Sequence, residues 1–223
     1  MFHSAAALNV ENIECALRAS APAETMLDLG CDDGELTLRL AAAAGAQRTV
    51  GVEVVAERAE LAAARGIDVR VASLNDPIPL EDASVDVVVS NQVIEHLADT
   101  DRFVREIHRV LRSGGTAVVS TENLASWHNI AALVFGWQPF SLTNVSSMSA
   151  GLGNPLAVHR GDSFSKAWEH LRVFAYQGLR ELFELHSFVV EDMYGAGLYP
   201  LPATLGRRLP RHAAFLTLVA RRA

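Results

Sequence analysis

Two hydrophobic patterns alternate along the chain: short continuous apolar runs, and stripes of apolar residues at helical spacing. A continuous run predicts a strand buried on both faces, and a stripe predicts an amphipathic helix. The runs predict strands at 26–29, 49–54, 69–72, 85–90, 116–121, 188–194 and 214–221. The stripes predict helices at 5–19, 36–43, 56–65, 101–111, 127–135 and 175–186. Because strands alternate with helices, we expect an α/β fold built on a parallel sheet.

The segment 124–171 breaks this rhythm. It has weak periodicity, scattered glycines and all three tryptophans of the chain. A segment this long without strong periodicity is usually functional or mobile. We interpret it as an insertion that covers an acceptor pocket, and a structural arm or an oligomer contact is the alternative. A chain of 223 residues suits one domain, which would span 1–223.

The charge balance bears on the kind of partner. The formal net charge is -7, whereas binding to nucleic acid needs a basic face that replaces phosphate counterions. Arg207, Arg208 and Arg211 form a local basic group, which we interpret as a solvated turn before the last strand. Nucleic acid is therefore an unlikely substrate, and a small molecule is the expected partner.

The cysteines and the apolar runs indicate the compartment. Cys15 and Cys31 have neither metal-ligand spacing nor a disulfide framework, which is typical of a reducing compartment. Glu11 and Glu14 interrupt the N-terminal apolar positions, so no signal peptide is expected. No apolar run approaches the ~18 residues that a membrane span requires. These features predict a soluble, cytoplasmic protein that does not bind a membrane.

Residues suited to ligand binding follow four of the predicted strands. Segment 28–34 follows the first strand, Glu53 ends the second, 73–76 follow the third, and 91–96 follow the strand at 85–90. In an open parallel sheet, a ligand binds beyond the carboxyl ends of the strands, where the strand order reverses. Glu53 lies about 20 residues past Gly30, the spacing at which a carboxylate meets the ribose hydroxyls of a nucleoside. The alternative for Glu53 is an exposed acid at a helix start.

Several motifs at these strand ends resemble one family. LDLGCDDG at 27–34 resembles the LDxGCGxG motif of class I S-adenosylmethionine (SAM) dependent methyltransferases, and NQVIEHL, LRSGG and STEN continue the resemblance to residue 123. The stretch 170–197 is similar to the end of methyltransferase-11 type members. The resemblance implies a Rossmann-like, seven-stranded, mostly parallel sheet with helices on both faces and an antiparallel last strand. Asp32 and Ser73 stand where the family usually has glycine and aspartate.

The resemblance also implies a cofactor, SAM, and a site for it. Glu53 would hold the ribose, Gly30 and its neighbours the methionine part, and Leu74 with Asn75 the adenine edge. The implied cofactor-binding residues are Asp28, Gly30, Cys31, Asp32, Gly34, Glu53, Val54, Ser73, Leu74, Asn75, Asn91, Gln92 and Val93. NAD fits less well, because Asp32 and Glu35 stand where a GxGxxG loop needs glycine and would repel a pyrophosphate.

His96 is the expected catalytic residue. It follows the strand after which the activated methyl would face its acceptor, and a neutral imidazole can accept a proton near physiological pH. The alternative is a histidine at a helix start that bonds to the backbone. Some methyltransferases bind a divalent ion through ExxEH, but here Gln92 replaces the first acid and leaves only Glu95 and His96. We therefore expect no metal.

The acceptor side offers fewer signals. The residues expected to form the substrate pocket lie in or beside the insertion and are Asn123, Trp127, His128, His170 and Arg172. The predicted function is methyl transfer from SAM to a small-molecule or sugar-like acceptor, whose methylated atom the sequence does not identify. The alternatives are a catalytically silent SAM-binding regulatory protein and a transferase that uses a related nucleoside cofactor, such as decarboxylated SAM.

Overall fold

The computed structural model describes residues 2–157, 161–163 and 168–223. Within these residues the strands are β1 (Thr25–Leu29), β2 (Arg48–Glu53), β3 (Asp68–Val71), β4 (Val85–Asn91), β5 (Leu111–Glu122), β6 (Phe188–Ala196) and β7 (Phe215–Arg222). The helices are α1 (Phe2–Ser20), α2 (Glu35–Ala44), α3 (Ala56–Ala64), α4 (Thr100–Val110), α5 (Trp127–Val134) and α6 (Tyr176–Leu185). Short 3-10 helices are η1 (Ile94–His96), η2 (Phe140–Leu142), η4 (Ala203–Arg207) and η5 (Pro210–His212).

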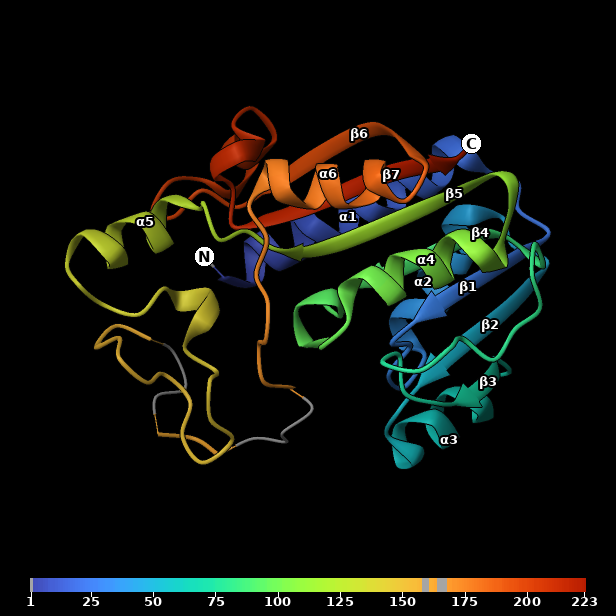
Figure 1. Ribbon diagram of the computed structural model, residues 1–223, viewed down its shortest axis with the longest axis horizontal. Coiled ribbons are helices and arrows are strands. Elements are labelled where there is room, and N and C mark those ends of the chain that lie inside the picture. Colours follow the sequence, from blue (N-terminus) through green and yellow to red (C-terminus); the bar gives the residue numbers. More distant parts are fainter. Residues whose placement is uncertain (1, 158–160, 164–167) are drawn as a thin grey trace.

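The strands form one sheet in the order β3-β2-β1-β4-β5-β7-β6 (Figure 1). Strands β1 to β5 pair in parallel, whereas β7 runs antiparallel to both of its neighbours. This confirms the predicted Rossmann-like, seven-stranded, mostly parallel sheet with an antiparallel last strand. The strand order reverses between β1 and β4, which places the expected ligand crevice at their carboxyl ends.

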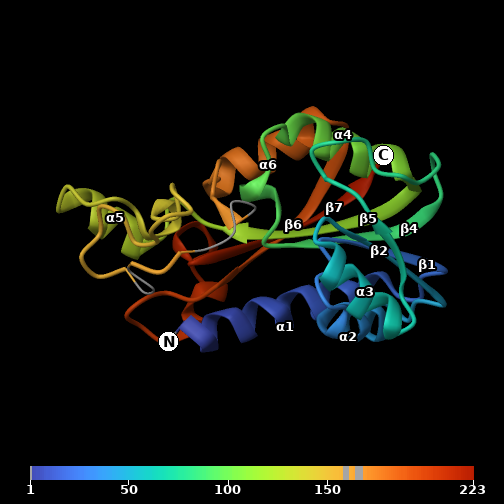
Figure 2. The ribbon, with the colours of Figure 1, turned by 90° about the horizontal axis from the view of Figure 1, so that it is seen from below.

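Helices cover both faces of the sheet, as predicted. Figure 2 shows α1, α2 and α3 on one side and α4 and α6 on the other. On the second side, Phe103 and Ile107 of α4 share a core with Leu179 and Phe183 of α6. On the first side, Leu17 of α1 belongs to a separate core with residues of α2. Both faces are therefore sealed, and the carboxyl edge of the sheet remains for the connecting loops.

Helix α4 shows how the sequence determines element boundaries. The Asp99 carboxylate accepts a hydrogen bond from the backbone N–H of Arg102 at 2.9 Å, which caps the helix start. Phe103 and Ile107 are buried at helical spacing, as the pattern predicts. The strand after the helix differs from the prediction. Strand β5 begins directly at Leu111 rather than at 116, and the β4–β5 register shifts between these two residues.

Buried polar contacts attach α1 to the strand ends. The Asn9 side-chain oxygen accepts hydrogen bonds from the hydroxyls of Ser120 (2.8 Å) and Thr217 (3.0 Å). Its amide group donates to the side-chain oxygen of Asn91 at 3.0 Å. Because a buried polar group left unpaired is costly, these bonds hold α1 against β4, β5 and β7. They also fix the Asn91 side chain at the end of β4.

The insertion at 124–171 extends beyond one end of the sheet (Figures 1 and 2). Its described part contains α5, η2 and irregular chain, as the weak periodicity predicts, and 158–160 and 164–167 lie outside the described residues. Val134, Phe135 and Met148 are 77%, 67% and 85% exposed. Oligomer formation through this segment stays a prediction. Across the part of the chain that the structure describes, we find no helix with the length and apolar character to span a membrane.

Candidate cofactor and acceptor site

A cavity of about 820 Å³ lies at the carboxyl ends of β1 to β4. Its volume falls within the range of roughly 300–1,000 Å³ that is usual for small-ligand sites. The loops after these strands supply most of its walls, as the switch-point rule predicts. Of the predicted residues, the lining includes Asp28, Gly30, Cys31, Asp32, Glu53, Val54, Ser73, Leu74, Asn75, Asn91, Gln92, Val93 and His96.

Gly30 creates space at the centre of this edge. Its φ of +86° lies in the left-handed region that glycine adopts without strain. A Cβ atom at this position would lie 2.5 Å from Cγ2 of Val93, which follows β4. The loops after β1 and β4 can therefore approach each other only because residue 30 has no side chain.

The Glu53 carboxylate is bound by backbone amides as well as facing the cavity. One oxygen accepts hydrogen bonds from the N–H groups of Val54 (2.9 Å) and Val55 (2.8 Å) at the start of α3. The other accepts from the N–H of Asp32 at 3.0 Å. A carboxylate has about four acceptor sites, so roughly one remains for a ligand. Glu53 thus ties the β1 loop to the α3 start and presents its remaining lone pair to the cavity.

Asp28 is a buried acid beneath the glycine loop. It is 5% exposed, and its carboxylate accepts a hydrogen bond from the Thr37 hydroxyl at 2.6 Å. Burial raises the pKa of Asp28 to about 6, and the Thr37 bond opposes this rise. The negative charge of Glu53 adds to the increase. The acid is therefore poised to change charge near neutral pH.

Asp32, at the position where the family has glycine, adopts a left-handed conformation with φ +48°. Aspartate is among the few residues other than glycine that tolerate this region. Arg58 of α3 donates to both oxygens of the Asp32 carboxylate, one at 2.7 Å, and these bonds lower the pKa of Asp32. Arg58 also lies 3.5 Å from the carboxylate of Asp33. Arg58 of α3 thus holds the loop after β1 through two of its aspartates.

The loop after β3 is shaped by its own polar groups. The Ser73 hydroxyl accepts from the backbone N–H of Asn75 at 3.2 Å. The Asn75 side chain accepts from the N–H of Ala98 at 2.8 Å, and its carbonyl accepts from Arg102 at the same distance. Asn75 therefore connects the β3 loop to the loop before α4. Both loops belong to the wall of the cavity.

Gly34 and Cys31 are predicted cofactor residues whose main contacts are with the protein core. A Cβ on Gly34 would lie 2.6 Å from Cδ1 of Ile67 and 3.1 Å from Cβ of Ala62, so Gly34 serves helix packing and is not in the lining. Cys31 reaches the lining but is buried beside Gly51, and burial raises the pKa of its thiol to about 12. Its thiol is therefore uncharged in this setting.

Several lining residues were not predicted from the sequence, namely Asp33, Leu36, Thr37, Leu40, Val52, Val55, Arg58, Ala72, Leu97 and Trp168. Arg58 could have been found, because the first turn of a helix that follows a parallel strand faces the same sheet edge. Trp168 has no comparable signal. It comes from the insertion, is 62% exposed, and reaches the cavity only through the tertiary path of that segment.

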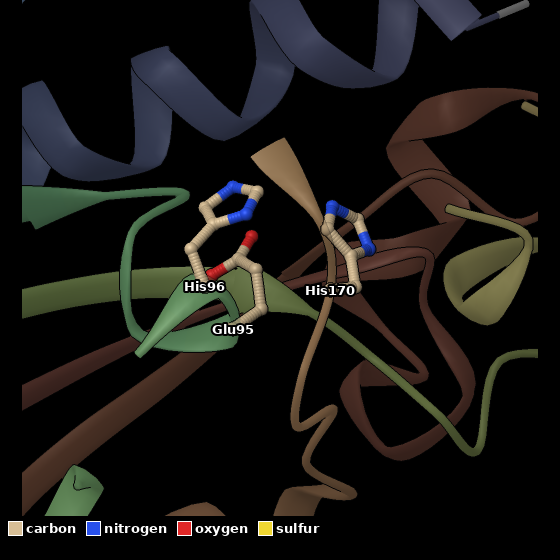
Figure 3. Close-up of side chains that lie close together, drawn as sticks. All are labelled: Glu95, His96 and His170. Carbon is tan, nitrogen blue, oxygen red and sulfur yellow. The ribbon is translucent and has the colours of Figure 1, made fainter. Parts of the chain in front are cut away.

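His96 brings the cavity close to a second group of polar residues. Figure 3 shows the carboxylate of Glu95 beside the His96 ring, with His170 across from both. One ligand atom from each of the three residues lies within 4.8 Å of the others. Burial lowers the pKa of His96, and burial raises the pKa of Glu95 to about 8. The sequence placed His170 with the acceptor residues, and the structure places it beside His96.

Two further buried groups adjoin this cluster. One oxygen of Glu122 and the hydroxyl of Tyr199 are enclosed without a hydrogen-bond partner among the described residues. The Glu122 oxygen lies 3.6 Å from Nδ1 of His170. Burial raises the pKa of Glu122, and burial together with the charge of Glu122 raises the pKa of Tyr199 to about 12. Buried polar groups thus gather next to the cofactor cavity, and we call the set of Glu95, His96, His170, Glu122 and Tyr199 the polar chamber.

Other predicted acceptor residues have structural partners. The Asn123 amide group donates to the carbonyls of Arg211 (3.0 Å) and Ala213 (2.8 Å). Trp127 is 48% exposed and packs on the His212 ring.

His128 and Arg172 complete the predicted acceptor set. The His128 ring contacts Phe140 and Tyr199, and burial lowers its pKa to about 4. Arg172 donates to the carbonyl of Ala98 at 2.7 Å. Neither residue lines the cavity, so their acceptor roles stay predictions.

Known proteins share this sequence pattern and fold. Residues 27–119 match a family model described as a methyltransferase domain. A probable S-adenosylmethionine-dependent methyltransferase from Mycolicibacterium smegmatis is 35% identical over 189 residues, which cover 81% of this chain and 60% of that protein. An ajmaline N-methyltransferase from Rauvolfia serpentina is 36% identical over 101 residues, which cover 42% of this chain and 34% of that protein. The chain spans no more than 60% of either curated relative.

A solved structure agrees over almost the whole chain. The SAM-dependent methyltransferase from Methanosarcina mazei matches with a TM-score of 0.65 at 17% identity, over 92% of this chain and 96% of that chain. At this identity the likeness establishes the fold. The sheet order, the strand-end cavity and these matches define a class I methyltransferase. Residues 27–119 match the methyltransferase domain family, and the similarity to SAM-dependent methyltransferases together with the fold indicates SAM as the cofactor.

Proposed function

We propose that this chain binds SAM in the cavity at the ends of β1 to β4 and transfers its methyl group to a small-molecule acceptor. The observation that carries the proposal is the cavity itself, formed by consecutive strand ends around Gly30 and Glu53. The relative from Rauvolfia serpentina is, by its name, an N-methyltransferase of ajmaline. That name supports a small-molecule acceptor for the present chain.

The residues of the cavity fit a ligand with a cationic centre. Its lining holds Asp28, Asp32, Asp33 and Glu53 against the single guanidinium of Arg58. Bound SAM supplies an activated methyl group on a positively charged sulfur. An acidic lining attracts such a group and repels a pyrophosphate, which extends the preference for SAM over NAD from the loop to the whole site.

The chain's residues divide the work of binding. The glycine at position 30 lets the β1 and β4 loops approach each other in the cavity wall, and Glu53 offers its remaining acceptor site for a ribose hydroxyl. Leu74 and Asn75 form a wall after β3, where an adenine edge would lie. His96 stands at the far side, where the cavity meets the polar chamber of Glu95, His170 and other buried groups. The acceptor is therefore expected in or above that chamber, where alignment and exclusion of water promote transfer.

Calorimetry with S-adenosylhomocysteine, the demethylated product, tests the proposal. We expect micromolar binding, and Glu53→Ala should weaken it by about 1.5–3 kcal/mol, the scale for charge-assisted hydrogen bonds. The matched control is Glu60→Ala, which removes an exposed acid of α3 outside the cavity lining and should leave affinity unchanged.

Absence of binding by the unmodified chain would overturn the proposal, and unchanged affinity in the Glu53 variant would remove that residue from the site. Transfer itself needs an acceptor screen with radiolabelled methyl donor. Binding without transfer to any acceptor would instead favour the regulatory SAM-binding protein that the sequence leaves open.

A further inference from the structure

One carboxylate oxygen in the polar chamber lacks any donor. Glu95 is 1% exposed, and its Oε2 accepts a hydrogen bond from the Thr121 hydroxyl at 2.9 Å. Its Oε1 is closed to water and has no hydrogen-bond partner among the described residues. Burying a carboxylate oxygen without a partner is costly, so this atom calls for a proton or a cation.

Two imidazoles lie near the Glu95 carboxylate (Figure 3). The ring centroids of His96 and His170 lie 4.8 Å apart, with an interplanar angle of 66°. Nδ1 of His96 lies 3.0 Å from the carbonyl of Glu169, and Nδ1 of His170 lies 2.7 Å from the carbonyl of Ser141. A carbonyl only accepts, so each contact fixes a ring and leaves one lone pair on the neutral imidazole. Backbone anchoring of this kind is common for histidines that ligate metals.

The backbone holds the three residues in one place. The N–H groups of Leu171 and Arg172 both donate to the carbonyl of Glu95, at 2.7 and 3.1 Å. These bonds dock the end of the insertion onto η1, directly beside His170. The cluster is therefore assembled by main-chain contacts and does not depend on flexible surface side chains.

We propose that Glu95, His96 and His170 bind a divalent first-row transition-metal ion. Their ligand atoms lie within 4.8 Å of one another. Metal–ligand bonds of about 2.0–2.2 Å bring such atoms to separations of roughly 3–4 Å, so a small closure of the cluster suffices. A bare cation is also smaller than a water molecule, which suits an oxygen that water cannot reach.

The donor set favours a transition metal over magnesium. Two imidazole nitrogens with one carboxylate suit zinc, iron, cobalt or manganese, whereas magnesium prefers oxygen ligands in octahedral geometry. The Gln92 side-chain amide donates to the Ser120 hydroxyl at 3.2 Å. In the proposed set His170 is the third ligand, and no acid at position 92 is required. The sequence showed only Glu95 and His96, because the third ligand lies on a distant segment.

The ion would lie between the cofactor cavity and the polar chamber, since His96 belongs to both. Three protein ligands leave at least one coordination position for an oxygen of the acceptor. An oxygen bound to a divalent ion would have a lower pKa, so its proton could pass to solvent water before methyl transfer and no side-chain base would be required. This role rests on the proposed function and replaces the base role that the sequence predicts for His96. Binding of the ion does not depend on it.

Cobalt absorption tests the site without any methyl transfer. Chelator-treated protein is titrated with Co²⁺, whose visible bands report nitrogen and oxygen ligation, and bound metal is counted by mass spectrometry. We expect one ion per chain. Glu95→Gln and His170→Ala should each weaken binding roughly tenfold or more. The control His186→Ala removes a histidine of the α6 end, outside the cluster, and should bind Co²⁺ as the unmodified chain does.

The variants and the metal titrations have results that would overturn the proposed metal site. Thermal unfolding identifies a variant that has lost its fold, and His170→Asn, which keeps a side-chain donor for the Ser141 carbonyl, replaces the alanine variant in that case. No bound Co²⁺ in the unmodified chain, or equal affinity in the folded cluster variants, would overturn the site. Displacement of Co²⁺ by stoichiometric Mg²⁺ would overturn the transition-metal assignment. Failure to bind S-adenosylhomocysteine would contradict the proposed function and leave the Co²⁺ result standing.

Discussion

The cofactor side and the acceptor side of this molecule are built differently. On the cofactor side, short loops leave adjacent strands at one edge, and most predicted residues line the same cavity. On the acceptor side, residues of β5, η1, the insertion and the loop after β6 form the polar chamber around His170. The first side follows from local sequence and strand order, whereas the second depends on where a long irregular segment folds back.

This difference explains why one half of the site is readable from sequence. A glycine or an acid directly after a buried strand has few places to go, because the strand fixes its position at the sheet edge. A polar residue in an irregular segment can bind a ligand or satisfy the backbone, and its sequence neighbourhood does not decide between them. Asn123, directly after β5, and His170, in the insertion, have opposite environments: the amide of Asn123 is satisfied by two carbonyls, whereas His170 faces an unpartnered acid.

The strongest test of the cofactor side is Gly30→Ala. The new Cβ would meet Val93 at 2.5 Å in a left-handed backbone, so the β1 and β4 loops must separate. We expect S-adenosylhomocysteine affinity to fall roughly 100-fold or more, from the combined cost of overpacking and strain. Calorimetry on protein with an unchanged circular-dichroism spectrum measures this effect.

Gly66→Ala is the matched control for that variant. Gly66 has a similar φ of +90°, but a Cβ there has no neighbour within 4 Å. Backbone strain alone should cost about 1–2 kcal/mol of stability and leave ligand affinity intact. If both alanine variants weakened the ligand equally, the space between the two loops would not be what Gly30 provides.

A smaller effect is expected from the buried acid beneath the loop. Because burial raises the pKa of Asp28 to about 6, the protonated form stabilises the folded chain. That contribution is fully present below the unfolded pKa of about 4 and is lost as pH rises through about 6. In Asp28→Asn the group cannot ionise. Relative to the unmodified chain, the variant should therefore gain about 2–3 kcal/mol of stability between pH 4 and pH 8.

Urea unfolding of both proteins across this range measures the difference. Thr37→Val is a second test of the Asp28–Thr37 pair, because it removes the hydroxyl that favours the charged form of Asp28. The pH-dependent loss should become larger in that variant. Parallel stability curves for Asp28→Asn and the unmodified chain would show that the pKa of Asp28 is the same in the folded and unfolded states, against the expected rise.

The fold was predictable to the level of strand order and helix faces. Stripes such as Phe103 and Ile107 specify one buried helix face, and runs such as 85–90 specify a strand covered on both sides. Boundaries were less accurate where turn residues entered a strand, as at the start of β5. Residues 113–115 lie inside β5 at the irregularity of the β4–β5 register, between Leu111 and Thr116, and no local pattern predicted their place in a strand.

The cofactor-site residues were predictable where the end of a strand fixes a residue in the cavity lining. Glu53 and Asn75 line the cavity as expected, although both also bond to backbone groups, which spacing alone does not reveal. The clamp of Arg58 on Asp32 compensates for the missing glycine and was not foreseen. His170 joined Glu95 and His96 only through the return of the insertion to η1.

The smallest expected effect concerns Asn123 and tests the acceptor side directly. Its amide group donates to two carbonyls, and its oxygen accepts from the N–H of Ala125 at 3.0 Å. Asn123→Ala leaves these backbone groups unpaired in a buried place, so we expect a loss of about 1–2 kcal/mol in stability. Affinity for S-adenosylhomocysteine should not change. The exposed amide of Gln177 on α6 is the control, and Gln177→Ala should alter stability by less than about 0.5 kcal/mol. A stable Asn123 variant with a raised KM for an identified acceptor would instead assign this residue to acceptor binding. The functional polar residues would then extend from the insertion to the end of β5.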